Sequence, residues 1–396
     1  MRFALTLLAM TSAITSAITS GMLGGSLVAA DPAPRFEEQV IEPNIGKVCY
    51  GLTLADVNGD SRQDVVAVSE NRVLWYENPT WTLHEIIVDQ TVPDNVCIAP
   101  YDIDGDGQID FALGAGWMGK NTGTLQWLRR GKSLSDRWTV HAIGAEPSTH
   151  RMRFADVLGT GRPQLVVSPL NATQGPGVRL LAFEIPADPV HDRWQETILN
   201  HDLNRMHNHW HVHWHHGQPA QTLTASREGI HFVELLPSGF FTTQLAPGTP
   251  GDQPNQRGAG EIKDGRLPNG DRFLTSVEPM HGTMLAVYLH EKEPKSVWKR
   301  VEIDAGFQRG HALWTADLDG DGADEIVFGH SDTPGAFGVQ FYKAAQPDGS
   351  EWTRHHVDVG GMATEDLIVG DLNGDQKPDI IAGGRSTHNV KIYWNR

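Results

Sequence analysis

The residues best suited to chemistry lie together in one segment, HNHWHVHWHH, at positions 207–216. Six of the chain's 19 histidines are found there, and five of them alternate with other residues, at 207, 209, 211, 213 and 215. Since alternate residues of a β-strand share a face, we expect a strand with these five histidines on one side. Trp210, Val212 and Trp214 then lie on the other side. An H-x-H spacing lets two imidazoles of one strand bind a metal such as Zn²⁺, so the segment is a candidate metal site.

Oxygen-bearing side chains form a second group with chemical potential. Four segments repeat one motif: ADVNGDSRQDVVAV (55–68), YDIDGDGQIDFALG (101–114), ADLDGDGADEIVFG (316–329) and GDLNGDQKPDIIAG (370–383). Positions 1, 3, 5 and 9 of the loops are Asp56, Asn58, Asp60 and Asp64; Asp102, Asp104, Asp106 and Asp110; Asp317, Asp319, Asp321 and Glu325; and Asp371, Asn373, Asp375 and Asp379. Crowded carboxylates repel one another unless a hard cation lies among them, and Ca²⁺ accepts about six to eight oxygens. We predict structural Ca²⁺ in up to four loops; the alternative is an Asx-rich turn without an ion.

The spacing of this motif predicts the fold. A fifth copy, ADVLGTGRPQLVVS (155–168), keeps the leading Asp156 but lacks the other acids, so we expect it to bind no ion. The five leading aspartates are separated by 46, 54, 161 and 54 residues. Because 161 is three times about 54, two degenerate units lie between Asp156 and Asp317, which makes seven units in all.

Each unit contains four short apolar runs separated by turn residues, which is typical of β-strands. The fourth run begins with Trp or Phe, and its seventh copy, Phe36 with Ile41, lies at the start of the chain. We therefore predict an all-β fold, a seven-bladed β-propeller of four-stranded blades in which the N-terminal strand closes the last blade. A single propeller domain is expected to span residues 31–396.

The N-terminal segment and the composition limit where the protein works. Residues 1–30 resemble a signal peptide with a small-residue cleavage site at Val28-Ala29-Ala30, so we expect a secreted or periplasmic protein. The net charge of −17 and the lack of a basic stripe argue against nucleic acid as a partner. No later segment approaches the ~20 apolar residues of a spanning helix, so we expect no membrane partner. Cys49 and Cys97 fall in adjacent blades, and either a disulfide or two packed thiols fits the sequence.

Propeller topology places the candidate site at the mouth of the central channel. Six positions before the leading aspartates stand Tyr50, Val96, His150, His311 and Glu365, and the two degenerate units place His207 and Glu261 at the same level. The loops after the second strands add Arg227, Glu228, Glu278, His281, His330 and His388. We predict a transition metal bound by His207, Glu261, His281 and His311, with His150 as base and Arg153 orienting substrate oxygens. Within the histidine segment, His207 and His209 are expected to reach the mouth. Histidines packed without a metal are the alternative.

Two resemblances support this interpretation. The acidic repeat resembles the VCBS/FG-GAP repeat of calcium-loop propellers. The segments HRMRFADVLGTGRPQLVVSPL, GAGEIK, EPMHG and RGHALWTADLDGDGADEIVFGH resemble the propeller domain of the aldos-2-ulose dehydratases and their bacterial relatives. The second resemblance implies dehydration of keto sugars and a zinc ion at the base of the active-site cleft.

These observations lead to a functional prediction. We expect a secreted, metal-dependent carbohydrate lyase or dehydratase that performs β-elimination on a keto sugar or a sugar acid, with carbohydrate as its partner. The alternative is a non-catalytic, calcium-stabilised propeller of the adhesion type that binds carbohydrate or protein. A different propeller enzyme, such as a hydrolase or an oxidoreductase, is a third possibility.

Overall fold

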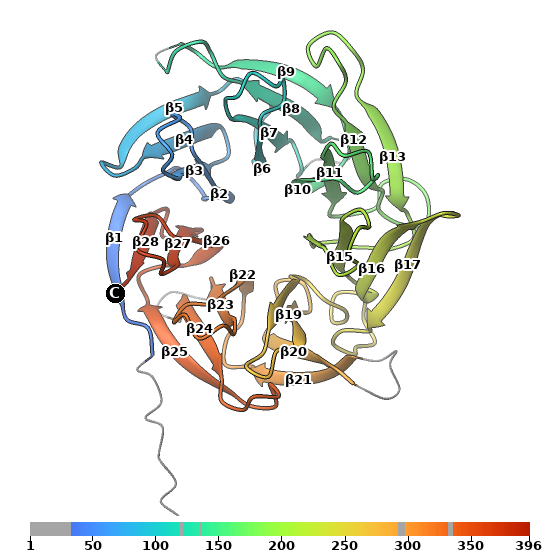
Figure 1. Ribbon diagram of the computed structural model, residues 1–396, viewed down its shortest axis with the longest axis vertical. Coiled ribbons are helices and arrows are strands. Elements are labelled where there is room, and N and C mark those ends of the chain that lie inside the picture. The colour runs from blue at the N-terminus through green and yellow to red at the C-terminus, as the bar shows by residue number, and fades with distance from the viewer. Residues whose placement is uncertain (1–32, 119–121, 135, 292–297, 332–335) are drawn as a thin grey trace, which may run out of the picture. The chain divides into compact units, whose positions relative to one another are not determined.

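A computed structural model describes residues 33–118, 122–134, 136–291, 298–331 and 336–396. Its 28 strands form seven four-stranded antiparallel sheets arranged in a ring (Figure 1). The predicted all-β, seven-bladed propeller is confirmed. Among the described residues, no helix is long and apolar enough to cross a membrane.

The blades follow one another along the chain, and in blades 1 to 6 the four strands run in order from the channel to the rim. Blade 1 contains β2 (Gly51–Ala55), β3 (Asp64–Val68), β4 (Arg72–Glu77) and β5 (Thr82–Val88), and blade 2 contains β6 (Asn95–Tyr101), β7 (Asp110–Ala115), β8 (Thr124–Arg129) and β9 (Thr139–Gly144). Blade 3 contains β10 (Thr149–Ala155), β11 (Gln164–Pro169), β12 (Leu180–Glu184) and β13 (Gln195–Asn200), and blade 4 contains β14 (Asn208–Val212), β15 (Gln221–Ser226), β16 (Gly229–Leu236) and β17 (Gly239–Ala246). Blade 5 contains β18 (Lys263–Arg266), β19 (Arg272–Glu278), β20 (Met284–His290) and β21 (Trp298–Asp304), and blade 6 contains β22 (Gly310–Ala316), β23 (Glu325–His330), β24 (Gly338–Ala344) and β25 (Trp352–Val359).

Blade 7 is built from both ends of the described chain. It contains β26 (Thr364–Gly370), β27 (Asp379–Gly384) and β28 (Val390–Asn395), and its outermost strand is β1 (Phe36–Glu42). β1 pairs antiparallel with β28, from Phe36 opposite Asn395 to Glu42 opposite Val390. The predicted closure of the last blade by the N-terminal strand is therefore confirmed.

The strand through the histidine segment is shorter than predicted. β14 contains only His209 and His211 of the five alternating histidines. His207 lies just before it, where its backbone N–H donates to the carbonyl of Ala225. After Val212 the chain leaves the sheet, because the side chain of Gln221 accepts hydrogen bonds from the next backbone amides, including that of Trp214. The later histidines, at 213, 215 and 216, are solvent-exposed.

The core lies between neighbouring blades rather than within one sheet. One buried cluster joins Val66 and Trp75 of blade 1 to Phe111 and Leu113 of blade 2. Both cysteines are buried free thiols within this packing, so the two-thiol alternative holds and the disulfide does not. Such packing makes each blade depend on the next.

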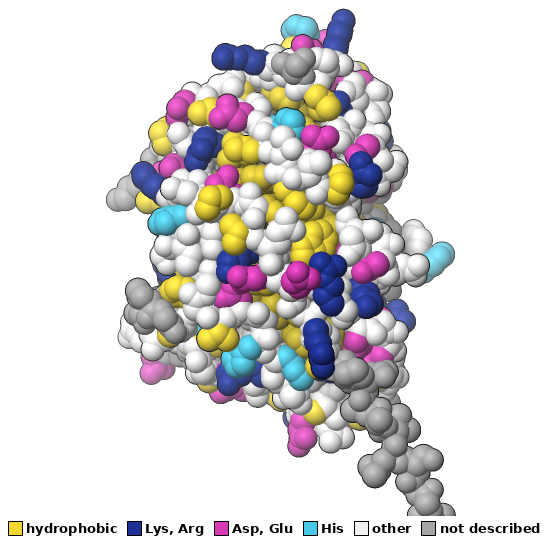
Figure 2. Space-filling model, turned by 90° about the vertical axis from the view of Figure 1, so that its left-hand side faces the viewer, with side chains coloured by type: hydrophobic (Ala, Val, Ile, Leu, Met, Phe, Trp, Pro, Cys, Tyr) yellow, Lys and Arg dark blue, Asp and Glu magenta, His cyan; other side chains and the backbone are white. Residues whose placement is uncertain are grey.

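The rim consists of the outermost strands, whose outer edges have no sheet partner. Figure 2 views the side on which β1 lies and shows apolar side chains scattered among charged ones. Val40 and Leu83 are among the exposed large hydrophobic residues of these strands. Charged side chains on an edge strand oppose pairing with a second chain.

Candidate active site at the channel mouth

Local irregularities of the innermost strands position the predicted mouth residues. In blade 3 the pairing of β10 with β11 skips one residue between Thr149 and Arg151, and that residue is His150. The same skip falls on His311 in β22 and on Glu365 in β26. A β-bulge re-aims the side chain of its extra residue. The bulges therefore explain why these three side chains do not follow the regular alternation of side chains between the two faces of a strand.

Three histidines from three blades meet at the mouth. His207 precedes β14, His281 lies in the loop between β19 and β20, and His311 belongs to β22. The Nε2 atoms of His207 and His281 are 2.9 Å apart. The ring centroid of His311 lies 5.0 Å from that of His207 and 4.5 Å from that of His281. One nitrogen from each of the three lies within 4.8 Å of the others, so this histidine triad could hold a metal ion.

Two carboxylates lie beside imidazoles of the triad. Glu261 Oε1 lies 2.8 Å from His207 Nδ1, so it contacts the nitrogen that does not face His281. Glu365 Oε1 lies 3.6 Å from His311 Nε2 and accepts a hydrogen bond of 2.7 Å from Arg385. Carboxylates placed in this way fix the tautomer and orientation of metal-binding histidines. Glu261, predicted as a ligand, is thus placed behind His207 rather than within the triad.

Electrostatics keeps two of these imidazoles, those of His281 and His311, neutral. Burial lowers the pKa of His311 and of His281 below the usual range, and the neighbouring histidines lower it further. Burial would raise the pKa of Glu261, but its contact with His207 and the charge of Arg151 outweigh burial and lower the pKa to about 2. Neutral imidazoles with an ionised carboxylate behind them are the protonation states that metal binding requires.

The triad has nitrogen atoms available to a transition metal. The Nε2 atoms of His207 and His281 face each other at 2.9 Å, and in a neutral pair only one of them can carry the proton between them. The buried Nδ1 of His311 has no hydrogen-bond partner among the described residues. Buried polar atoms without a partner are rare and call for an explanation. Nitrogen ligands in such a set suit Zn²⁺ or a similar ion.

His150 adjoins the triad and is held by the residue that follows it. Its ring centroid lies 4.7 Å from that of His207. Arg151 Nη1 donates to His150 Nε2 over 3.2 Å, and burial and this charge lower the pKa of His150 well below its usual range. Because a guanidinium group can only donate, the proton of the neutral ring lies on Nδ1. This tautomer makes His150 a hydrogen-bond donor at Nδ1, whereas the predicted role of base requires the other tautomer.

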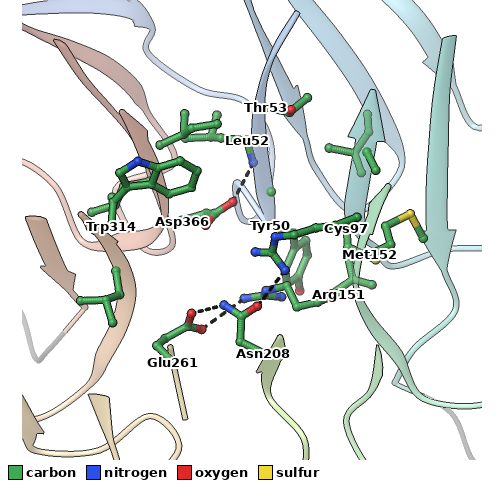
Figure 3. Close-up of a pocket in the computed structure, with 18 of the residues that line it drawn as sticks. Tyr50, Leu52, Thr53, Cys97, Arg151, Met152, Asn208, Glu261, Trp314 and Asp366 are labelled. Carbon is green, nitrogen blue, oxygen red and sulfur yellow. Dashed lines mark hydrogen bonds and ion pairs between the residues drawn. The ribbon is translucent and has the colours of Figure 1, made fainter. Parts of the chain in front are cut away.

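A cavity of about 320 Å³ continues from the mouth into the channel (Figure 3). Charged side chains from several blades border it: Arg151, Arg153, Glu261, Lys263 and Asp366. Arg153, predicted to orient substrate oxygens, donates to Asn208 Oδ1 over 2.9 Å and to the carbonyl of His209 over 2.6 Å. Glu261, which contacts His207, also borders the cavity, so the cavity adjoins the triad.

Several residues of the prediction lie outside this site. His209 is buried and its Nδ1 lies 2.9 Å from Ser168 Oγ of blade 3, so it does not reach the mouth as predicted. Glu278 accepts hydrogen bonds from Thr249, Tyr288 and Arg300, which engage both of its oxygens in a structural network. The sequence did not single out Arg151, Lys263 or Asp366. Each lies one or two positions after a predicted mouth residue, and this spacing could have indicated that it borders the channel.

The acidic loops connect the first two strands of blades 1, 2, 6 and 7, beyond the other ends of the innermost strands. In the first loop, Asp56 accepts hydrogen bonds from the backbone amides of Gly59, Asp60 and Ser61. In each of two loops, three carboxylates lie close enough together to hold a metal ion. These groups are Asp102, Asp104 and Asp110, and Asp317, Asp319 and Glu325. In the second of these groups the ammonium group of Lys343 contacts Asp319 and lies 2.7 Å from Asp321 Oδ2.

The fifth copy of the loop folds in the same way without these acids. Asp156 accepts from the amides of Thr160 and Gly161, as Asp56 does in the first loop. Gln164 Oε1 accepts from the amide of Val157, as Asp64 Oδ2 accepts from that of Val57 in the first loop. The turn itself therefore depends on the first and ninth positions as hydrogen-bond acceptors, and the ninth need not be charged.

Comparisons with known proteins agree with this architecture. A family model of the aldos-2-ulose dehydratase β-propeller domain matches residues 122–291, and a model of the FG-GAP-like repeat matches residues 56–113 and 317–382. Aldos-2-ulose dehydratase of Phanerodontia chrysosporium is 26% identical over 229 residues, which is 52% of this chain and 25% of that protein. The match thus spans about a quarter of the length of that relative.

A solved structure supports the fold alone. BBS1N, solved in complex with ARL6DN, superposes with a TM-score of 0.54 at 11% sequence identity, over 91% of this chain and 96% of that one. At this identity the likeness carries no argument about ligands or activity.

Proposed function

Since the chain is a seven-bladed propeller of FG-GAP-like repeats, related to the propeller domain of aldos-2-ulose dehydratase, we propose that it is a metal-dependent carbohydrate lyase. Its reaction would be a β-elimination on a keto sugar or a sugar acid. The observation that carries the proposal is the largely buried histidine triad, with the carboxylate of Glu261 on the second nitrogen of His207 and that of Glu365 near His311. A propeller that only binds calcium in its loops gives no reason for such a cluster at the opposite mouth.

His207, His281 and His311 would hold the metal, and Glu261 would orient His207. When bound, a divalent ion supplies Lewis-acid polarisation of a substrate oxygen, which acidifies the neighbouring C–H group. The remaining work falls to the side chains around the triad.

Two of these side chains can act on the reacting groups. Glu365 Oε2 is buried and has no hydrogen-bond partner among the described residues, so it is free to accept the proton from the carbon next to the carbonyl. His150 carries its proton on Nδ1, so it can donate a hydrogen bond to the departing hydroxyl group. The C–H electron pair forms the new C=C bond as the C–O bond breaks, and the hydroxyl group takes up the proton held by Glu365 and leaves as water. We therefore assign proton transfer to Glu365 and hydrogen bonding of the leaving group to His150.

We also propose that the acidic loops bind Ca²⁺ in a structural role. Their carboxylates are clustered in the two groups described above, and hard oxygen ligands at this spacing suit Ca²⁺. The loops lie at the opposite ends of the innermost strands from the triad, so removal of calcium is expected to lower stability rather than to change the chemistry directly.

Secretion is a further part of the proposal. The signal peptide predicted at residues 1–30 lies outside the described residues. N-terminal sequencing of the protein from its host is expected to find a start near Asp31. A start at Met1 in the cell interior would contradict export.

The test of the enzymatic proposal combines metal analysis with an elimination assay. After a wash with a calcium chelator, the wild-type protein is expected to retain about one transition metal per chain. It should also generate rising ultraviolet absorbance from keto sugars or uronate polymers, because elimination creates an unsaturated product. His281→Ala is expected to lose both properties, whereas His213→Ala, an exposed histidine of the same segment as His207, should retain them. Equal metal content and absorbance in the two variants would refute the proposal.

A further inference from the structure

We propose that the cavity below the triad binds the carboxylate of a sugar acid, which makes an acidic keto sugar the preferred substrate class. This inference rests on the proposed function, because it places the remainder of the substrate beneath the triad. It comes from the charges that border the cavity in Figure 3 rather than from the triad itself.

The cavity is bordered by more positive than negative charge. Its cations are Arg151, Arg153 and Lys263, and its carboxylates are Glu261 and Asp366. The lining therefore carries one positive charge in excess, and a divalent metal at the triad would add two more.

Neither carboxylate neutralises the deeper cations directly. Glu261 is engaged by His207 and accepts a hydrogen bond from Asn208, and its contact with Arg151 is long, at 3.9 Å. Asp366 Oδ2 accepts from the backbone amide of Leu52 over 2.8 Å. The short contacts of both carboxylates are therefore with uncharged donors or with His207, and the contact of Glu261 with a guanidinium group is long.

Among the described residues, Arg153 and Lys263 have only neutral partners within hydrogen-bonding distance. Arg153 donates to an amide oxygen and to a backbone carbonyl, as described above. Lys263 is buried; its ammonium group lies 4.3 Å and 5.1 Å from the ring centroids of Trp210 and Trp314 and 3.4 Å from the carbonyl of Ile262. A buried cation without an anion beside it is unfavourable, and an anionic ligand group would relieve this.

The dimensions and position of the cavity suit such a ligand. Its volume of about 320 Å³ exceeds that of a single sugar ring, and Glu261 in its lining contacts His207 of the triad. A keto group at the mouth and a carboxylate between Arg153 and Lys263 could therefore belong to one small molecule. The indoles of Trp210 and Trp314 add apolar surface on which the C–H face of a sugar can pack.

The experiment compares two sugars that differ at one carbon. 2-Keto-D-gluconate carries a carboxylate where D-fructose carries a hydroxymethyl group, and acetate serves as the carboxylate without a sugar. We expect calorimetry at pH 6 and low salt to show 2-keto-D-gluconate binding at least about tenfold more tightly than D-fructose or acetate. The preference should also be present in metal-free protein, and it should weaken at high salt.

Variants test the cavity charges in opposite directions. Lys263→Met keeps the length and apolar stem of the side chain and should reduce the preference to below about threefold, with D-fructose binding unchanged. Asp366→Asn retains an acceptor for the Leu52 amide and should increase the affinity for 2-keto-D-gluconate. If Lys263→Met does not fold, the direction of the Asp366→Asn effect still decides the question.

The outcomes separate this inference from the proposed function. Equal affinities for 2-keto-D-gluconate and D-fructose would overturn the inference, even if the protein eliminates water from neutral keto sugars. Equal affinities for acetate and 2-keto-D-gluconate would overturn the sugar-acid assignment in favour of a site for small anions. Preferential binding without an unsaturated product from any of these sugars would support the inference and contradict the lyase.

Discussion

At the scale of single residues, the site is defined by the groups that surround each imidazole of the triad. The carboxylate of Glu261 lies against Nδ1 of His207, and that of Glu365 lies 3.6 Å from Nε2 of His311. The two glutamates differ in their hydrogen bonds, because Glu261 Oε2 accepts from Asn208, whereas Glu365 accepts from Arg385 through Oε1 and its Oε2 has no partner among the described residues. This difference predicts different consequences for the same substitution.

Glu261→Gln should impair metal binding. The amide cannot supply the negative charge behind His207, so we expect the affinity for Zn²⁺ to fall by about 10–100-fold. Competition with a chromogenic zinc chelator measures this. Glu184→Gln, an exposed glutamate at the end of β12, is the matched control and should leave the affinity unchanged. An unaltered zinc affinity in Glu261→Gln would remove Glu261 from the metal site.

Glu365→Gln should instead impair the reaction. The amide cannot accept the proton, so at saturating metal we expect kcat for the elimination to fall by about 100-fold or more. The metal content measured on the same sample should remain near that of the wild type. A variant that keeps the wild-type kcat would exclude Glu365 as the base and would return that role to His150.

At the scale of elements, the sequence predicted the strands that follow the repeat, but it did not predict the local departures of single strands from that repeat. The acidic motif located the first two strands of five blades. The spacing between its copies then predicted the two blades without the motif, which begin with β14 and β18. The mouth residues could be found because they stand at one repeat position. The length of β14 could not, since its end depends on Gln221, which lies in the next strand. The bulges at His150, His311 and Glu365 also depend on the partner strands and leave no local signature.

The acidic loops predict a stability that depends on pH when calcium is absent. Burial raises the pKa of the ninth-position acids, to about 6 for Asp64 and Asp379, about 7 for Asp110 and about 8 for Glu325. Between their unfolded values and these values the folded state binds more protons than the unfolded state. The free energy of unfolding of the metal-free protein should therefore fall as pH rises from about 4 to 8.

Calcium should abolish most of this dependence, because the ion stabilises the ionised carboxylates. Urea unfolding of metal-free protein and of protein in excess calcium, each from pH 5 to 8, measures the effect. The stabilisation by calcium is expected to grow with pH. A stabilisation that does not change over this range would show that these acids do not face the ion.

The loop of blade 6 has a cation of its own. Lys343 contacts Asp319 and Asp321, and its ammonium group lies 3.6 Å from Glu325 Oε1. Lys343→Met removes this ammonium group from the acidic cluster. In metal-free protein we therefore expect the free energy of unfolding to fall by about 1–3 kcal/mol. In excess calcium the loss should be smaller, because the ion takes over the role of the ammonium group. Lys377→Met, exposed in the loop of blade 7, is the control and should have little effect in either condition.

At the scale of the whole molecule, the ring holds the triad together only while it is closed. His207, His281 and His311 come from blades 4, 5 and 6, and no pair of them shares a blade. The packing between blades sets the distances between these histidines. If the ring opened at blade 7, neighbouring blades could shift relative to one another at each interface between them. We therefore expect the pairing of β1 with β28 to support the site, although it lies on the rim.

Removal of β1 should show this dependence. A chain that begins at residue 43 exposes the backbone of β28 as a new edge, so we expect a lower Tm and a tendency to associate through that edge. It should also bind zinc more weakly than the full chain, although every triad residue is present. A synthetic peptide of residues 33–42 offers the missing strand and should restore Tm and zinc affinity together, since strand addition re-forms the blade. If the truncated chain keeps the Tm and zinc affinity of the full chain, closure by β1 does not support the site. If the peptide restores Tm but not zinc affinity, the triad depends on something other than the closed ring.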